Sequence, residues 1–180
     1  MALVDLDKLY EENGVSAEKR LAVLEQHPQV VNRDELIARE ANLEIFNGAY
    51  DQAIVLLKTR FFRAWEGGGR FNLGNSWINA NLLKGRQQFA RGEFKDALPS
   101  YQAALVLPSN LQEAAGNVGI RKAEIMYWIG TVYEALGGAD KAQQSFRGAS
   151  ESVVTFGSGE TGRESYSHWH RASHGRARSR

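Results

Sequence analysis

Three histidines near the C-terminus are the side chains whose spacing comes nearest to a metal site. His168, His170 and His174 lie within the segment SHWHRASH, and their imidazole nitrogens could chelate a metal ion. They have neither an acidic nor a cysteine companion, and the chain holds no cysteine at all. We therefore expect adventitious metal affinity and no metal site. His27 stands alone before Pro28, which indicates a helix-end residue.

The densest group of aromatic side chains lies between Phe61 and Trp77. Within it, Trp65 stands directly before Glu66, and an aromatic face beside a carboxylate is what a sugar-binding site uses. The alternative is that these rings pack over the edge of neighbouring helices, and we favour it because large rings mostly supply buried area. Trp65 and Glu66 are therefore a candidate ligand loop, with packing as the preferred interpretation. The glycines that follow lack the spacing of a phosphate-binding loop.

Nothing else in the chain resembles catalytic machinery. There is no nucleophile elbow, no metalloprotease helix of the HExxH type, and no pair of carboxylates with supporting residues. We expect a protein that is not an enzyme and that uses no cofactor.

Composition excludes further classes of function. The 180 residues carry a formal net charge of +1, which argues against binding nucleic acid or an anionic membrane through bulk charge. The basic C-terminal segment RASHGRARSR gives only a weak, salt-sensitive attraction to such polyanions. No apolar run approaches the roughly 18 residues of a membrane span. The N-terminus has no basic region followed by an apolar core, so we expect a soluble, cytoplasmic protein.

The chain is organised around a predicted pair of helices between Met126 and Ala149. One apolar stripe of helical spacing is followed by a glycine break and a second stripe, which predicts two helices folded back on each other. Gly130 and Ala142 have almost no side chain, so the two backbones can approach closely. Tyr133 and Phe146 fill the space beside them. The stripes are Met126, Ile129, Gly130 and Tyr133, then Ala142, Phe146 and Ala149, with the break at Gly137 and Gly138.

The same order of residues recurs upstream. Turn glycines stand at Gly48, Gly92 and Gly137, separated by 44 and 45 residues, and an apolar stripe containing alanine follows each. Regularity of this kind indicates stacked units that cannot bury their apolar faces alone. We expect an all-α fold of three to four helix pairs over residues 1–150.

The ends of the first helices have their own signals. A helix from Leu6 is expected to end at Gly14, because glycine readily adopts the left-handed conformation. Ser16 is the expected N-cap of the next helix. Asn32, with Glu35 three residues later, resembles a capping box at the start of the third.

No apolar periodicity continues past Ser150. Residues 151–180 are mostly Gly, Ser, Arg and His with a few aromatic residues, and such a segment cannot bury enough surface to offset the entropy of ordering. We expect a disordered basic tail. Two hypotheses account for it: a genuine extension, or a truncated or shifted reading frame.

The helix pair at the end of the series resembles the tetratricopeptide (TPR) repeat. The signature W-x2-L-G-x2-Y followed by A-x3-F is met by the segments MYWIGTVY and AQQSF, with Met in place of the first aromatic. The resemblance implies an α-solenoid of antiparallel helical hairpins. A TPR repeats every 34 residues, and about ten residues are added here per unit, in loops at 62–74 and 108–119. The middle units depart from the signature, with Glu44 and Gln88 in the place of Tyr133.

Several stretches resemble a narrower group, the C-terminal TPR region of large bacterial proteins that carry an N-terminal mutarotase-like β-sandwich part. The resemblance implies an accessory region, with carbohydrate handling as its context. The chain departs from that pattern because the β-sandwich is absent and the tail does not continue into further helices. The stretches, within residues 18–149, are RLAVLEQHPQVV, FFRAWEGG, and LPSNLQEA followed by IRKAEIMYWIGTVYEALG.

TPR stacks bind peptides in a groove lined by the first helix of each pair, and the resemblance implies where that groove lies. Its mixture of aromatic residues with Asn and Arg suits an extended peptide or a helix of another protein. Cover by a neighbouring domain, such as a β-sandwich, is an equally weighted alternative. The lysines with which some TPRs clamp a terminal carboxylate are replaced by Ala38 and Leu83. The mapped positions are Glu35, Ala38, Asn42, Ile45, Phe46, Asn79, Leu82, Arg86, Phe89, Ala90, Glu124, Tyr127, Thr131 and Glu134.

We therefore expect a non-catalytic scaffold that binds a protein or peptide partner in its concave groove. The alternative is an accessory module of a carbohydrate-active multidomain protein, with the Trp65–Glu66 loop near a glycan site. Self-association through an exposed end helix is a third, less favoured hypothesis. The expected partner contacts are Asn42, Phe46, Arg86, Phe89, Tyr127 and Thr131.

Overall fold

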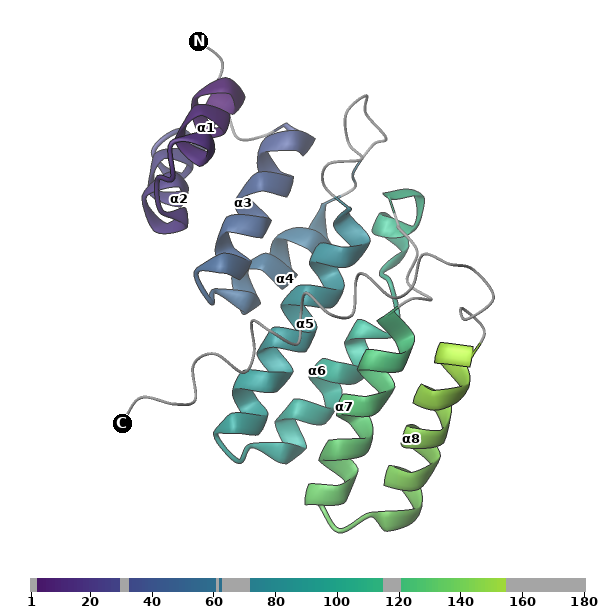
Figure 1. Ribbon diagram of the computed structural model, residues 1–180. Helices are drawn as coiled ribbons and strands as arrows, with labels where there is room; N and C mark the ends of the chain where they lie inside the picture. Colours follow the sequence, from purple (N-terminus) through teal and green to yellow (C-terminus); the bar gives the residue numbers. More distant parts are fainter. Residues whose placement is uncertain (1–2, 30–32, 61, 63–71, 115–120, 155–180) are drawn as a thin grey trace.

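The computed structural model describes residues 3–29, 33–60, 62, 72–114 and 121–154 (Figure 1). These residues form eight α-helices and a 3₁₀-helix, with no strand among them, so the expectation of an all-α fold is confirmed. The helices are α1 (Leu3–Glu12), α2 (Ala17–Glu25), α3 (Asp34–Phe46), α4 (Tyr50–Thr59), α5 (Leu73–Ala90), α6 (Phe94–Ala104), η2 (Ser109–Ala114), α7 (Lys122–Ala135) and α8 (Ala139–Val154).

The α-helices follow one another through space in the order of the chain. Each of α1 to α7 packs against the next, and α5 also packs against α3. The purple α1–α2 pair and the yellow-green α8 therefore lie at opposite ends of the molecule (Figure 1). The main apolar cluster of the described residues runs through this series, from Leu24 of α2 to Val132 of α7.

Four chain reversals share one geometry, which confirms the predicted glycine turns. Gly14, Gly48, Gly92 and Gly137 have φ values between 70° and 81°, a left-handed conformation that glycine adopts without a steric penalty. At each turn, the N–H of the residue after the glycine donates to the carbonyl five residues before it, as Gly138 does to Tyr133 at 2.8 Å. This hydrogen bond ends the helix and sends the chain back along it.

Within two of the pairs, a glycine of the first helix lies under an aromatic ring of the second. A Cβ placed on Gly130 would lie 2.6 Å from Cε1 of Phe146, and one on Gly85 would lie 2.7 Å from Cε1 of Tyr101. Each ring follows its glycine by sixteen residues. The prediction that a small residue at Gly130 allows close helix contact is therefore confirmed.

The ends of three elements differ in part from expectation. Ser16 is confirmed as the N-cap of α2, because its Oγ accepts from the N–H of Lys19 at 3.4 Å. The predicted capping box on Asn32 is wrong: Arg33 is the N-cap of α3 and makes no side-chain capping bond. Helix α8 continues to Val154, so the boundary expected at residue 150 is too early by four residues. Residues 155–180, the remainder of the expected tail, lie outside the described residues.

The described parts of the two longer loops meet at the C-terminal end of α4. The side-chain amide of Asn110 in η2 donates to the carbonyls of Leu57, at 2.8 Å, and Arg60. Phe62, at the start of the first loop, is buried. Between 3 and 154, in the ranges given above, no helix is both long and apolar enough to cross a membrane.

Candidate functional site

The expected partner contacts lie on stripes of α3, α5 and α7 that are linked by side chains. We call this surface the α3–α5–α7 face, formed by Asn42, Phe46, Ser76, Asn79, Arg86, Phe89, Tyr127, Trp128 and Thr131. Asn42 joins α3 to α5, because its Oδ1 accepts from the hydroxyl of Ser76 at 3.0 Å. Its amide nitrogen donates to the carbonyl of Ala38 at 2.7 Å. Asn42 is thus held by two bonds and is only half-buried.

A second link joins α5 to α7. The guanidinium of Arg121 donates to Oδ1 of Asn79 at 2.6 Å and pairs with the carboxylate of Glu124 at 3.2 Å. Asn79 and Glu124 were both expected to line the groove, and the structure brings them together through an arginine that the repeat mapping did not include. These three side chains fix the separation of the two helices at one end of the face.

An arginine lying on a tryptophan ring forms the middle of the face. The guanidinium carbon of Arg86 is 5.2 Å from the ring centroid of Trp128, within the range of a cation–π contact. Phe89 meets the same ring edge-on at a centroid distance of 6.4 Å. Among the described residues Arg86 has no carboxylate partner, and both Arg86 and Trp128 are half-buried. The sequence reasoning included Arg86 and Phe89 but missed Trp128.

Two large apolar side chains of the face are exposed to solvent. Tyr127 is 54% exposed, with its ring 5.8 Å from that of Trp128, and Phe46 at the end of α3 is 79% exposed. Thr131, one turn beyond Tyr127, is half-buried and donates its hydroxyl to the Tyr127 carbonyl at 3.0 Å. Exposed aromatic rings beside a guanidinium are typical of surfaces that bind protein segments.

Three of the expected lining positions are wrong. Ala38, Ile45 and Leu82 are buried and belong to the apolar core, where they fill the space between neighbouring helices. In α3, Asn42 and Phe46 reach the surface instead, and in α5 Arg86 does so. The apolar side chains beside it are needed to hold those helices together.

The candidate ligand loop, Trp65 and Glu66, lies outside the described residues, so its assignment to a glycan site stays a prediction. The neighbouring rings that are described are packing groups. Phe62 is buried, and the buried Trp77 donates its indole N–H to the carbonyls of Ala103 at 3.0 Å and Val106 at 3.1 Å.

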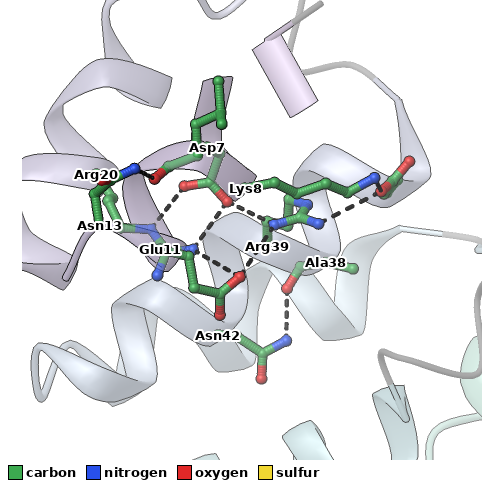
Figure 2. Close-up of polar contacts among 10 residues, drawn as sticks. Asp7, Lys8, Glu11, Asn13, Arg20, Ala38, Arg39 and Asn42 are labelled. Atoms are coloured by element: carbon green, nitrogen blue, oxygen red, sulfur yellow. Dashed lines mark hydrogen bonds and ion pairs between the residues drawn. The ribbon is translucent and has the colours of Figure 1, made fainter. Parts of the chain in front are cut away.

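A buried network of charged side chains joins α1, α2 and α3 (Figure 2), and the sequence reasoning did not find it. Asp7 is 3% exposed and Arg39 is 2% exposed, and Nη1 of Arg39 lies 2.7 Å from Oδ2 of Asp7. Arg20 donates to both oxygens of the same carboxylate, at 2.8 and 2.9 Å. Glu11 and Glu35 lie at the edge of the network, 3.8 and 3.6 Å from Arg39.

The two guanidinium groups set the charge of Asp7. Burial alone would raise its pKa, but hydrogen bonds and charge attraction from Arg20 and Arg39 outweigh burial and lower the pKa below the usual value. A signal for the network does exist in the sequence. Seven residues before the turn glycines stand Asp7, Ala41, Gly85 and Gly130, so a carboxylate replaces a small residue in the first pair only.

Glu44 of α3 is a buried carboxyl that pairs with no arginine in the described ranges. It is 8% exposed, and its Oε2 has no hydrogen-bond partner among the described residues. Burial, together with the negative charges of Glu40 and Glu25, raises the pKa of Glu44 to about 7. The corresponding residue of α5 is the neutral Gln88, whose Oε1 accepts from the hydroxyl of Ser100 at 2.7 Å.

No group of three or more metal-ligating side chains is found in the part of the chain that the structure describes. The histidines at 168, 170 and 174 lie outside that part. No protein-family model matches the chain.

Proposed function

We propose that this protein is a TPR-like α-solenoid that acts as a non-catalytic scaffold and binds a protein or peptide partner on its α3–α5–α7 face. The solenoid assignment is supported by the recurrence of one unit. The turn glycines Gly48, Gly92 and Gly137 repeat at intervals of 44 and 45 residues. Gly85 and Gly130, and the rings of Tyr101 and Phe146 that cover them, repeat at an interval of 45 residues. Each unit covers the next, as in other repeat proteins.

The observation that carries the binding proposal is the pairing of Arg86 with Trp128 beside the exposed ring of Tyr127. Trp, Tyr and Arg are the residue types that contribute most to binding energy at protein interfaces. Arg86 has no carboxylate partner in the described structure, so it can accept one from a ligand without breaking an existing ion pair. We expect the partner to present an acidic side chain next to an apolar one.

Rigid support is a second reason to choose this face. The bonds of Asn42 to Ser76 and of Asn79 to Arg121 hold the three helices at fixed separations. A surface that is ordered before binding loses less conformational entropy when the partner arrives. This favours a face that spans several helices over the isolated exposed residues elsewhere, such as Val55 and Val106.

Selection from a random peptide library displayed on phage, with the full chain as target, tests the proposal. We expect selected peptides to share an acidic residue near an apolar one and to lose at least about tenfold in affinity for Tyr127→Ser. Val106→Ser is the matched control, because Val106 is 68% exposed but lies off the face. Equal loss in both variants, or loss in neither, would count against the α3–α5–α7 face.

A further inference from the structure

Helix α8 carries an aromatic ring whose counterpart earlier in the chain is covered by another helix. The ring of Phe146 covers Gly130 in the same way that the ring of Tyr101 covers Gly85. Tyr101 is fully buried, with the ring of Trp128 from α7 stacked on it at a centroid distance of 5.9 Å. Phe146 is only half-buried, and the extensive packing of α8 within the described residues is with α7 alone.

A hollow of about 330 Å³ lies beside Phe146, on this end of the series. It is an open depression and not an enclosed cavity, so an occupant would be covered on one side only. One wall is a single stripe of α8 and the other is the turn from α7. The lining residues are Ala139, Ala142, Gln143 and Phe146 on α8, with Glu134 and Gly137.

The residues that line the hollow indicate which chemical groups it can bind. Alanine side chains and the ring of Phe146 suit an aromatic group, as Trp128 suits Tyr101. Glu134 is exposed and has no cationic partner among the described residues, so it suits a positive charge next to that group. The hollow is therefore complementary to an aromatic residue followed closely by a cation.

The chain itself carries that combination beyond Val154. Trp169 is followed two residues later by Arg171, and the segment 155–180 holds five arginines against two acidic residues. Trp169 lies fifteen positions after Val154, and an extended chain of that length reaches about 50 Å. The whole of α8 is about 24 Å long, so Trp169 can return to the hollow.

We propose that the segment following Val154 occupies the hollow, with the indole of Trp169 packed on Phe146 and the guanidinium of Arg171 paired with Glu134. Tethering favours this occupant over a second copy or a separate protein, because a short covalent link gives an effective concentration of the order of millimolar. Weak contacts are then sufficient. The hollow adjoins the α3–α5–α7 face, because the ring of Phe146 lies 5.8 Å from that of Tyr127. The proposed contact of the chain with itself nevertheless does not require that an external partner binds that face.

Paramagnetic relaxation measured on the full chain tests this contact. The protein has no cysteine, so a single nitroxide can be attached at Gln144→Cys, an exposed position of α8 that follows the lining residue Gln143 in the sequence. We expect loss of the indole N–H signal of Trp169, identified by its absence in Trp169→Phe. A nitroxide at Lys58→Cys on α4 is the control and should leave that signal unchanged.

Retention of the Trp169 signal with the α8 label would overturn the proposal. A loss that grows with protein concentration would also overturn it, because the hollow would then hold a second copy. Charge reversal adds an independent readout in the labelled chain. Arg171→Glu should restore part of the signal, and Arg171→Glu combined with Glu134→Arg should remove it again; an unchanged signal in both would exclude the ion pair. Far-UV circular dichroism verifies that every variant keeps its helices.

Discussion

The ring of Phe146 in α8 occupies the space that a side chain on Gly130 in α7 would need. Cε1 of the ring lies 2.6 Å from the position of the missing Cβ, and Cδ1 lies 2.7 Å from it. Carbon atoms of real side chains do not approach so closely, so the two helices can keep their separation only while residue 130 is glycine. The same contact occurs between Gly85 and Tyr101 in the preceding helix pair.

Gly130→Ala is expected to destabilise the protein by roughly 1–2 kcal/mol. The clash with the ring of Phe146 costs about 1–3 kcal/mol, and the better helix propensity of alanine returns up to about 1 kcal/mol. Urea unfolding followed by circular dichroism measures the difference. Gly148→Ala in α8 is the matched control: its Cβ meets only the flexible end of Met126, at 3.1 Å, so this variant should be as stable as wild type or more so. Equal effects of the two substitutions would contradict the packing argument.

Asp7→Asn is expected to lower the free energy of unfolding by about 3 kcal/mol, since it leaves the guanidinium of the buried Arg39 without its nearest carboxylate. Asp5→Asn, on the exposed side of the same helix, should change stability by a few tenths of a kcal/mol at most. Chemical denaturation at neutral pH compares the two. A loss of similar size for both would show that the network contributes nothing specific.

The same network predicts an acid dependence. Because the pKa of Asp7 is lower in the folded state than the unfolded value of about 3.9, its stabilising effect is complete above that pH and is lost as the pH falls through the folded pKa. The stability difference between wild type and Asp7→Asn should therefore shrink below about pH 4. A difference that stays constant down to about pH 2 would contradict the assigned pKa.

Glu44 predicts the opposite trend at higher pH. A carboxyl whose pKa is raised to about 7 binds a proton in the folded state that the unfolded chain has already released, so stability falls as the pH rises from about 4.5 to about 7. Glu44→Gln, which reproduces the neutral residue found at Gln88, should remove this slope. It should raise the free energy of unfolding by roughly 1–3 kcal/mol at about pH 8. The exposed Glu12→Gln is the control, and an unchanged slope in Glu44→Gln would show that another group titrates.

How far the sequence determines this fold differs from feature to feature. The reversals at Gly48, Gly92 and Gly137 were predictable because a left-handed backbone position has few alternatives to glycine. Close helix contact at Gly130 was predicted, but with Ala142 as the facing residue and Phe146 beside it; in the structure the ring of Phe146 itself covers Gly130. Asp7 and Arg39 are 32 residues apart, and no local rule selects that partner among the many arginines of the chain.

The α3–α5–α7 face shows the same division. Asn42, Arg86, Phe89 and Tyr127 were placed on it by the resemblance to the TPR repeat, whose groove positions were mapped onto the chain. The burial of Ala38 and Leu82 depends instead on how each helix is rotated against its neighbours, which spacing within one helix does not determine. Trp128, the ring on which Arg86 lies, was not predicted as a surface residue, because residues close to it in the sequence belong to the predicted core stripe.

The central claim is that a partner binds at Arg86, Tyr127 and Trp128, and the most direct measurement is the indole N–H resonance of Trp128 during titration of a selected peptide. Binding at this position should give a saturable shift of the Trp128 signal and leave the signal of the buried Trp77 nearly unchanged. Arg86→Gln should weaken the titration about tenfold while leaving helicity intact. Saturable binding that leaves Trp128 unshifted, or that Arg86→Gln does not weaken, would contradict it.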